Sequence, residues 1–207
     1  MLDSILAVAA VAASYLLGSV SFSILIARWV KGIDIRQHGS GNAGATNTLR
    51  VLGKGPAAVV FLLDVAKGIV AVLLGKWLGG GEIWVPILCG AAAITGHNWP
   101  IWFRFKGGKG IATTIGVMAV IAFWPALISG VVAIAAIAVT RYVSLGSLIF
   151  TALMPVFILV LSMPWELFGV SLLICVYAFI RHRSNIVKLI RGQEHKLGAG
   201  KGVPNGK

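Results

Sequence analysis

Long uncharged stretches alternate with short charged segments along most of the chain. The first stretch, from Ser4 to Ala27, holds 24 residues without a charge, enough for a helix to cross a hydrocarbon core about 30 Å thick. Six more apolar runs follow it. Backbone groups inside a bilayer must bond within the chain, so each run is predicted to be a helix. The seven runs are Ser4–Ala27, Pro56–Gly75, Ile83–Phe103, Ile111–Trp124, Ala126–Val139, Leu145–Leu161 and Trp165–Ile180.

The fourth and fifth runs are the ambiguous part of this pattern. Residues 111–139 could form one long helix, or two short helices that turn at Trp124 and Pro125. Each half would be about 21 Å long, which is short for a span. The distribution of charge favours two helices. With seven spans, 16 of the 18 basic residues face one side, whereas six spans would turn the seven basic residues of the C-terminal segment outward. The positive-inside rule then places the N-terminus outside and the C-terminus in the cytoplasm.

The composition agrees with a membrane protein. Of the 207 residues, 58% are hydrophobic and 12% are charged, whereas about 25% are charged in soluble domains. The net charge is +12 and the mean hydropathy is +0.93. These values exclude a soluble globule and a disordered basic protein. We therefore predict an all-α integral membrane protein with about seven transmembrane helices, formed as a single polytopic domain over residues 1–197 and followed by a flexible tail over residues 198–207.

Three loops on the predicted cytoplasmic side do not look like simple connectors. The first, Ser40 to Arg50, reads SGNAGATNTLR. Its glycines permit close backbone approach to a ligand, its amides and hydroxyls offer neutral hydrogen bonds, and Arg50 can bind a phosphate through two nitrogens. A flexible polar linker is the alternative interpretation.

The second loop, Gly96 to Gly110, reads GHNWPIWFRFKGGKG and leads into an apolar run. A glycine-rich turn that opens a helix presents free N–H groups and a positive dipole end to an anion. The loop is not a Walker A motif, because Gly110 follows Lys109 where Ser or Thr is required. The alternative is a turn that joins two helices.

The third segment, His182 to Glu194, reads HRSNIVKLIRGQE. His182 and Asn185 share one face of a helix. A basic amphipathic helix at the membrane surface is the alternative interpretation. Glu194 is one of two acids on the cytoplasmic side, and we expect it to brace Arg or Lys side chains. Inside the second span, Asp64 and Lys67 are three residues apart, and either a structural ion pair or a functional charge fits them.

Together these loops resemble the three cytoplasmic motifs of the bacterial acyl-phosphate:glycerol-3-phosphate acyltransferases, the PlsY family. The resemblance covers Leu2 to about Leu197. It implies transfer of a fatty acyl group from acyl phosphate to the 1-hydroxyl of glycerol 3-phosphate, which yields 1-acyl-glycerol 3-phosphate and phosphate in the first step of phospholipid synthesis. It also implies an enzyme of the bacterial cytoplasmic (inner) membrane whose active site faces the cytoplasm.

The resemblance assigns roles to residues of all three loops. The catalytic candidates are Arg50, His97, Lys109, His182 and Asn185. The substrate-binding candidates are Ser40, Asn42, Gly44, Thr46, Asn47, Arg50, Gly107, Gly108, Lys109, His182 and Asn185. Asp64, Lys67 and Glu194 are expected to give structural support. The proton acceptor stays open between a histidine, His97 or His182, and a phosphate oxygen of the donor.

Other chemistries fit the sequence less well. No histidine has an acidic residue five positions later, which excludes the acyltransferase class that uses such a pair. Two separated cytoplasmic acids cannot form a carboxylate cluster for Mg²⁺, so we expect no metal and no cofactor. We expect glycerol 3-phosphate, a long-chain acyl phosphate and the lipid bilayer as partners, no nucleic acid, and a monomer. A small anion transporter or channel is the main alternative. It would need polar residues along several spans, whereas the polar residues of this chain gather on one side of the predicted membrane.

Overall fold

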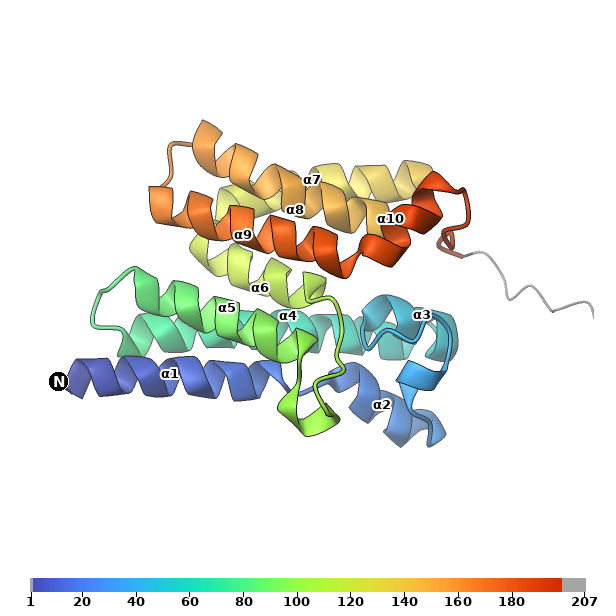
Figure 1. Cartoon of the computed structure of the whole chain (residues 1–207), viewed down its shortest axis with the longest axis horizontal. Helices are drawn as coiled ribbons and strands as arrows, with labels where there is room; N and C mark the ends of the chain where they lie inside the picture. The colour runs from blue at the N-terminus through green and yellow to red at the C-terminus, as the bar shows by residue number, and fades with distance from the viewer. Residues whose placement is uncertain (1, 199–207) are drawn as a thin grey trace, which may run out of the picture.

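The structure, a computed structural model, describes residues 2–198, so the predicted tail lies outside the described residues except for Gly198. Its regular elements are all helical, which confirms the all-α prediction for this part of the chain (Figure 1). The helices are α1 (Leu2–Gly18), α2 (Phe22–Lys31), α3 (Ala45–Leu52), α4 (Lys54–Leu78), α5 (Trp84–Asn98), α6 (Ile111–Ile121), α7 (Phe123–Thr140), α8 (Val143–Val160), α9 (Trp165–Arg181) and α10 (Arg183–Ile190), with 3-10 turns η1 (Ile35–Gln37) and η2 (Ile101–Phe103).

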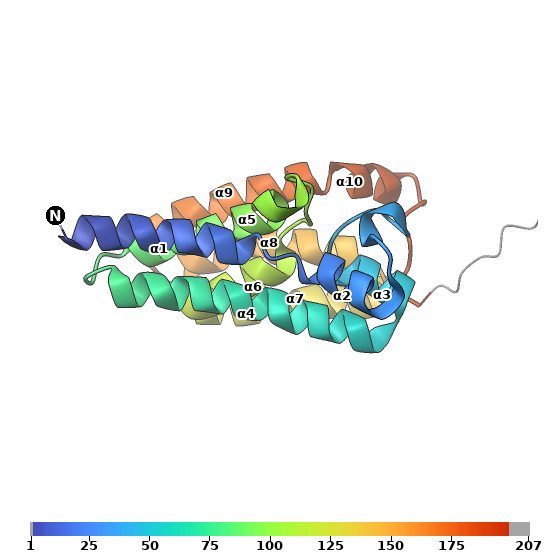
Figure 2. The same ribbon diagram turned by 90° about the horizontal axis from the view of Figure 1, so that it is seen from below.

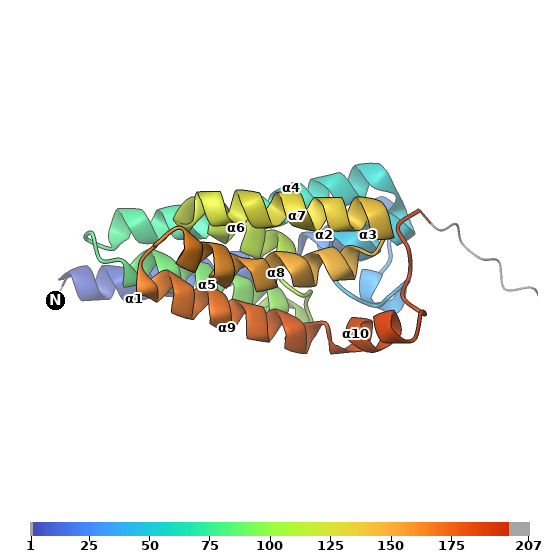
Figure 3. The ribbon, with the colours of Figure 1, turned by 90° about the horizontal axis from the view of Figure 1, so that it is seen from above.

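The long helices run side by side along the length of the molecule. Helices α1, α4 and α5 form one group, α7, α8 and α9 form the other, and α6 lies between them in contact with α4, α5 and α7. Figure 2 shows α1 and α4 on one face, and Figure 3 shows α7, α8 and α9 on the opposite face. The short helices α2, α3 and α10 gather at the end away from the N-terminus. The first loop and the third segment lie at that end, whereas the second loop follows the end of α5 nearer the middle of the molecule.

Glycines allow the helices of the first group and α6 to pack closely. A Cβ at Gly116 of α6 would lie 2.0 Å from the backbone oxygen of Val65 in α4. A Cβ at Gly96 of α5 would lie 2.2 Å from the backbone oxygen of Tyr15 in α1. Such small-residue contacts are typical of helix pairs in membranes. The hydrophobic effect does not drive helices together in lipid, so they associate through close van der Waals packing, which small residues permit. These close contacts hold α6 against α4 and α5 against α1.

Length and composition identify four helices that can span a bilayer, or five if the bent pair α9–α10 counts as one. The four are α1 and α2 taken together as one span (Asp3–Lys31), α4 (Lys54–Leu78), α7 (Phe123–Thr140) and α8 (Val143–Val160). Helices α5 and α6 hold 15 and 11 residues and fall below that length. Large apolar side chains point outward along the bundle, among them Trp29 and Val139 at 88% and 85% exposure. The number of seven spans stays a prediction.

Three element boundaries differ from the sequence prediction. Residues 111–139 do form two helices, but the break falls at Ala122 instead of at Trp124 and Pro125. Pro125 lies in the first turn of α7, where a missing N–H costs nothing. The first apolar run breaks between Gly18 and Phe22 into α1 and α2. The third run ends at Asn98, because a proline at position 100 disfavours helical backbone in the residue before it.

Candidate active site

One cavity of about 710 Å³ brings the three predicted loops together at the end of the bundle that carries α3 and α10. Its walls are polar near the loops and apolar between α6, α7 and α8. The polar, charged and glycine residues that line the cavity are Ser40, Gly41, Asn42, Gly44, Thr46, Asn47, Arg50, Asp64, His97, Gly107, Lys109, Gly110, Gly130, Ser144, Gly146, Ser147, Arg181, His182, Ser184, Asn185, Lys188 and Glu194. Of the predicted catalytic and substrate-binding residues, Gly108 alone does not line the cavity.

The first loop is folded around the side chain of Asn47. The Asn47 amide nitrogen donates to the backbone oxygens of Ile35 (3.1 Å) and His38 (2.9 Å), and its oxygen accepts the backbone N–H of Ser40 at 2.8 Å. Asn47 is 1% exposed. Its polar atoms are therefore taken up in shaping the turn that presents Ser40 and Arg50. The predicted substrate contact of Asn47 stays a prediction, and the structure gives this amide a bracing role.

The second loop folds back on the end of α5. The backbone N–H groups of Gly107 and Gly108 donate to the oxygens of Asn98 (3.2 Å) and His97 (3.1 Å). A Cβ on Gly108 would lie 2.2 Å from Nε2 of His97, so no larger residue fits there. These two N–H groups are already bonded in this structure. The first N–H groups of a helix have no partner within the helix. At the cavity these groups belong to the start of α6, where Ile111 and Ala112 line the wall. Gly110, which precedes α6, has a left-handed φ of 82°.

Lys109 leaves this loop and contacts the third segment. Its Nζ donates to the side-chain oxygen of Asn185, and the Asn185 amide donates to Oε1 of Glu194 at 2.9 Å. Glu194 was expected to brace Arg or Lys side chains, and in this structure it is linked to Lys109 through Asn185. Burial lowers the pKa of Lys109 to about 8, although the nearby Glu194 carboxylate acts in the opposite direction. The negative charge of a phosphate bound here would stabilise the protonated lysine and raise its pKa again.

His182 ends α9 with its ring nearly buried. Its Nδ1 lies 2.8 Å from the backbone oxygen of Ala178, so Nδ1 carries the proton and Nε2 can accept a hydrogen bond. Burial and, next, the charge of Lys109 lower the pKa of His182 to about 4. The ring is therefore neutral at physiological pH. It suits a hydrogen-bond acceptor better than a strong base.

A second group of charges lies deeper, where α4 meets α5. Asp64 pairs with Lys67 at 2.8 Å, and the Nδ1 of His97 lies 3.4 Å from the same carboxylate oxygen. Lys67 also donates to the backbone oxygen of Val20 at 2.9 Å. All three side chains are at most 5% exposed. The structure thus favours the ion-pair interpretation of Asp64 and Lys67, and Asp64 and His97 both form part of the cavity wall.

Sequence reasoning missed three charged or polar lining residues in or next to the third segment: Arg181, Ser184 and Lys188. Arg181 ends α9 and donates to the backbone oxygen of Gly108 at 2.8 Å. Ser184 and Lys188 are neighbours of Asn185 in α10, and their helical spacing was the signal that could have found them.

The chain after α10 returns across the cavity end to the α7–α8 corner (Figure 3). Nε and Nη2 of Arg141 donate to the backbone oxygen of Leu197 at 2.9 and 2.6 Å, and the Leu197 N–H donates to the Arg141 oxygen at 2.6 Å. We call residues 192–198 the strap. It holds Glu194, 8% exposed, in the cavity wall.

The family model for glycerol-3-phosphate acyltransferase matches residues 8–192. The chain belongs to the glycerol-3-phosphate acyltransferase family. It is 55% identical to the glycerol-3-phosphate acyltransferase of Shouchella clausii over 92% of this chain and 96% of that protein. It is 54% identical to the one of Halalkalibacterium halodurans over 89% and 92%. These matches confirm the resemblance that the three loops indicated.

Two solved structures share the fold of this acyltransferase-family chain. Both are of PlsY (YgiH), described as an integral membrane glycerol 3-phosphate acyltransferase, and both are 40% identical to this chain. The glycerol 3-phosphate form matches with a TM-score of 0.88 over 93% of this chain and 96% of that chain. The lysophosphatidic acid form matches with a TM-score of 0.85 over 93% and 95%. The fold class is therefore that of an integral membrane protein.

Proposed function

We propose that the protein transfers a fatty acyl group from acyl phosphate to the 1-hydroxyl of glycerol 3-phosphate. The products are 1-acyl-glycerol 3-phosphate and inorganic phosphate. Membership of the acyltransferase family supports the reaction class. The observation that carries the proposal for this chain is the cavity itself, in which Arg50, Lys109 and Lys188 meet an apolar wall. A phosphate head with a long acyl tail needs both surfaces in one site.

The polar end of the cavity supports binding of two phosphates. The cations of Arg50, Lys109, Arg181 and Lys188 line it, together with the carboxylates of Asp64 and Glu194. Asp64 is already paired with Lys67. The excess of positive charge favours anionic ligands in a partly dehydrated site. Ser40 and Asn185 add neutral hydrogen-bonding groups beside these cations.

The apolar end supports the acyl chain. Side chains of α6, α7 and α8 form this part of the wall, and they are Ile111, Ala112, Ile115, Ala126, Ala133, Ile134, Ile137, Val143 and Phe150. An acyl chain there would exchange lipid for protein contacts at little cost. The donor would enter from the bilayer, and its carbonyl carbon would lie near the cations that hold its phosphate.

In the proposed reaction the 1-hydroxyl oxygen attacks the acyl carbonyl carbon, and the bond from that carbon to the phosphate oxygen breaks. Acyl phosphate is an activated anhydride, so the protein mainly positions two reactants and stabilises negative charge. The hydroxyl proton goes to an oxygen of the departing phosphate, which becomes a better proton acceptor as it gains negative charge during bond cleavage. His182, whose pKa is lowered to about 4, is a weak acceptor by comparison.

Histidine variants test this proton route. With His97→Ala and His182→Ala each at saturating substrate, we expect turnover within about tenfold of wild type. A loss of about a thousandfold or more in either variant, with unchanged KM, would show that this histidine is the base.

We further propose the orientation of the protein in its membrane. Seven spans with the N-terminus outside place the three loops and α10 on the cytoplasmic side of a bacterial cytoplasmic membrane, where glycerol 3-phosphate is present. The basic residues that flank the cavity obey the positive-inside rule in this orientation. We propose that the enzyme acts as a monomer, since one chain supplies the whole cavity.

A direct assay tests the proposed function. Purified protein in detergent or liposomes receives palmitoyl phosphate and labelled glycerol 3-phosphate, without added metal. We expect labelled lysophosphatidate, and no product when palmitoyl-CoA replaces palmitoyl phosphate. Phosphate flux into liposomes without acyl transfer would support an anion transporter and would overturn the proposal.

A further inference from the structure

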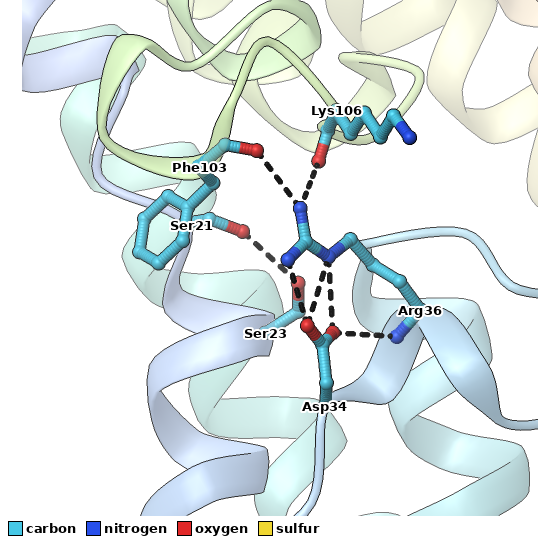
Figure 4. A network of polar contacts seen from close by, with 6 residues as sticks. All are labelled: Ser21, Ser23, Asp34, Arg36, Phe103 and Lys106. Carbon is cyan, nitrogen blue, oxygen red and sulfur yellow. Dashed lines mark hydrogen bonds and ion pairs between the residues drawn. The ribbon is translucent and has the colours of Figure 1, made fainter.

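An arginine outside the cavity joins the turn that precedes the first loop to the second loop (Figure 4). Arg36 lies in η1 and pairs with Asp34, which precedes this turn. The Arg36 Nη2 lies 2.7 Å from Oδ2 of Asp34, and Nε lies 3.0 Å from Oδ1 and 3.2 Å from Oδ2. The carboxylate also accepts the backbone N–H of Arg36 at 3.0 Å. This two-pronged pair fixes the plane of the guanidinium group.

The remaining nitrogen of that guanidinium reaches the second loop. Nη1 of Arg36 donates to the backbone oxygen of Phe103 at 2.8 Å and to that of Lys106 at 3.3 Å. The two residues between these carbonyls, Arg104 and Phe105, have φ angles of 58° and 57°. Residues with a Cβ rarely adopt this left-handed region, and they stay there when surrounding contacts hold them. Arg36 binds the backbone on both sides of this strained pair.

The strained pair leads directly to the phosphate-facing part of the loop. Lys106, whose oxygen Arg36 binds, is followed by Gly107, Gly108 and Lys109. Asn98 and His97 hold the N–H groups of the two glycines, and Arg181 holds the oxygen of Gly108. The direction in which the chain enters this segment therefore depends on the turn at Arg104 and Phe105. Arg36 is the side chain from the first loop that fixes this turn.

We propose that Arg36, oriented by Asp34, is a positioning residue that holds the turn at 103–106 and thereby places Lys109 for the acyl transfer. Arg36 does not line the cavity, and Asp34 neutralises its charge, so it is not a phosphate ligand. Arg36 acts on the loop by binding the backbone carbonyls of Phe103 and Lys106. This requires a planar guanidinium group, which can bind Asp34 and both carbonyls at the same time. A lysine at this position can pair with Asp34 but cannot also bind two carbonyls in a fixed plane.

The pair is stable over the whole working range of pH. Arg36 holds the pKa of Asp34 down to about 2, and Asp34 raises the pKa of Arg36 above its ordinary value. Both charges therefore persist at any pH at which the enzyme is assayed. A pH-dependent loss of this contact plays no part in the proposal.

The test compares Arg36→Lys with Arg191→Lys. Arg191 is an exposed cation at the end of α10, and no hydrogen bond of its side chain is present in the described residues. Each variant is assayed for acyl transfer, for thermal unfolding, and for hydrogen exchange of the Gly107 and Gly108 amides. In Arg36→Lys we expect kcat/KM to fall about tenfold to a hundredfold, exchange at both amides to quicken, and the unfolding temperature to change little. Arg191→Lys should match wild type in all three.

The outcomes separate a positioning role from a purely structural one. A lower unfolding temperature with faster exchange throughout the protein, and catalysis unchanged at a permissive temperature, would overturn the proposal. Wild-type kinetics and wild-type exchange in Arg36→Lys would also overturn it. If Arg36→Lys does not fold, Asp34→Asn leaves the arginine in place and should show the same local exchange to a smaller degree.

The kinetic part of this test rests on the proposed function, whereas the exchange part does not. If wild-type protein transfers no acyl group, the proposed function fails. The Arg36 proposal is then judged by the exchange of Gly107 and Gly108 alone, in which unchanged rates would contradict it.

Discussion

Two groups of charged side chains lie close together in this protein and differ in how their charges are balanced. In the deep group, Asp64 lies against Lys67 and His97, and all three are buried. In the loop group, Arg50, Lys109, Arg181 and Lys188 line the cavity, and Glu194 is the one acid that faces them from the same loops. The deep group satisfies its own charge. The loop group has four cations and one carboxylate, and a bound anion would balance part of this excess.

The difference separates charges that hold the structure from charges that bind. A buried ion pair inside the membrane is stable only while both partners are present. An excess of cations at the cavity costs stability in the free protein through mutual repulsion, and it strengthens the binding of a phosphate. The deep group also orients His97 toward the second loop and so helps to position that loop. Substitutions in the deep group should therefore mainly lower stability, whereas substitutions in the loop group should mainly weaken substrate binding.

The largest expected effect is on stability, in the deep group. Asp64→Asn leaves Lys67 buried without a counter-charge and should lower the free energy of unfolding by about 3–5 kcal/mol. Thermal unfolding in detergent measures this change. The double variant Asp64→Leu with Lys67→Met removes both charges and should regain most of the lost stability. An equally unstable double variant would show that packing, not charge balance, dominates here.

The next effect is on catalysis, in the loop group. Lys109→Ala should raise the KM for glycerol 3-phosphate roughly a hundredfold, because a charged hydrogen bond to phosphate is lost. Its unfolding temperature should stay the same or rise, since a repulsive cation is removed. Lys106→Ala, an exposed lysine three residues earlier, is the matched control. An unchanged KM in Lys109→Ala would contradict the binding assignment.

The pH dependence follows from the lowered pKa of Lys109, about 8. The protonated lysine binds phosphate, so kcat/KM should be level below this pKa and fall up to tenfold per pH unit above it. The pH dependence of kcat/KM reports the free enzyme, whereas that of kcat reports the enzyme–substrate complex. Because a bound phosphate raises the pKa of Lys109, kcat should begin to fall at a higher pH than kcat/KM. Pre-steady-state or initial-rate profiles measure both. In Lys109→Arg the decline near pH 8 should disappear, and its persistence would assign the titration to another group.

The smallest effect concerns the strap. Arg141→Gln removes the two side-chain hydrogen bonds to the Leu197 oxygen, whereas the backbone hydrogen bond from the Leu197 N–H to the Arg141 oxygen stays. The strap would then hold Glu194 less firmly, and we expect kcat/KM to fall by no more than about fivefold, the equivalent of one ordinary hydrogen bond. Limited proteolysis should cut residues 192–198 faster than in wild type. A loss as large as that of Lys109→Ala would mean that the strap belongs to the catalytic apparatus.

Helix boundaries could be predicted from the sequence where a change in composition marks them. A helix start at Ile111 was predictable, because the apolar run begins directly after the glycine-rich turn. The break of residues 111–139 was placed near Pro125 because proline interrupts helices. It falls at Ala122 instead, and Pro125 lies in the first turn of α7, where helices tolerate proline.

Contacts between distant residues could not be read from the sequence. The amide of Asn47 looked free, yet it is used within its own loop. Arg36 looked like one more basic residue, yet it binds carbonyls that are 67 and 70 positions away. Glu194 was expected beside a cation and reaches its site through Asn185. Each of these depends on how the loops meet in space.

Binding of glycerol 3-phosphate without any acyl donor tests the central claim most directly. Titration calorimetry compares wild type with the Arg50→Ala/Lys109→Ala double variant, using glycerol 3-phosphate, inorganic phosphate and glycerol in turn. Wild type should bind both phosphates saturably and glycerol not at all, and the double variant should lose at least tenfold in affinity for each phosphate. Equal affinity in the two proteins would contradict the view that the unbalanced cations of the cavity form the phosphate site.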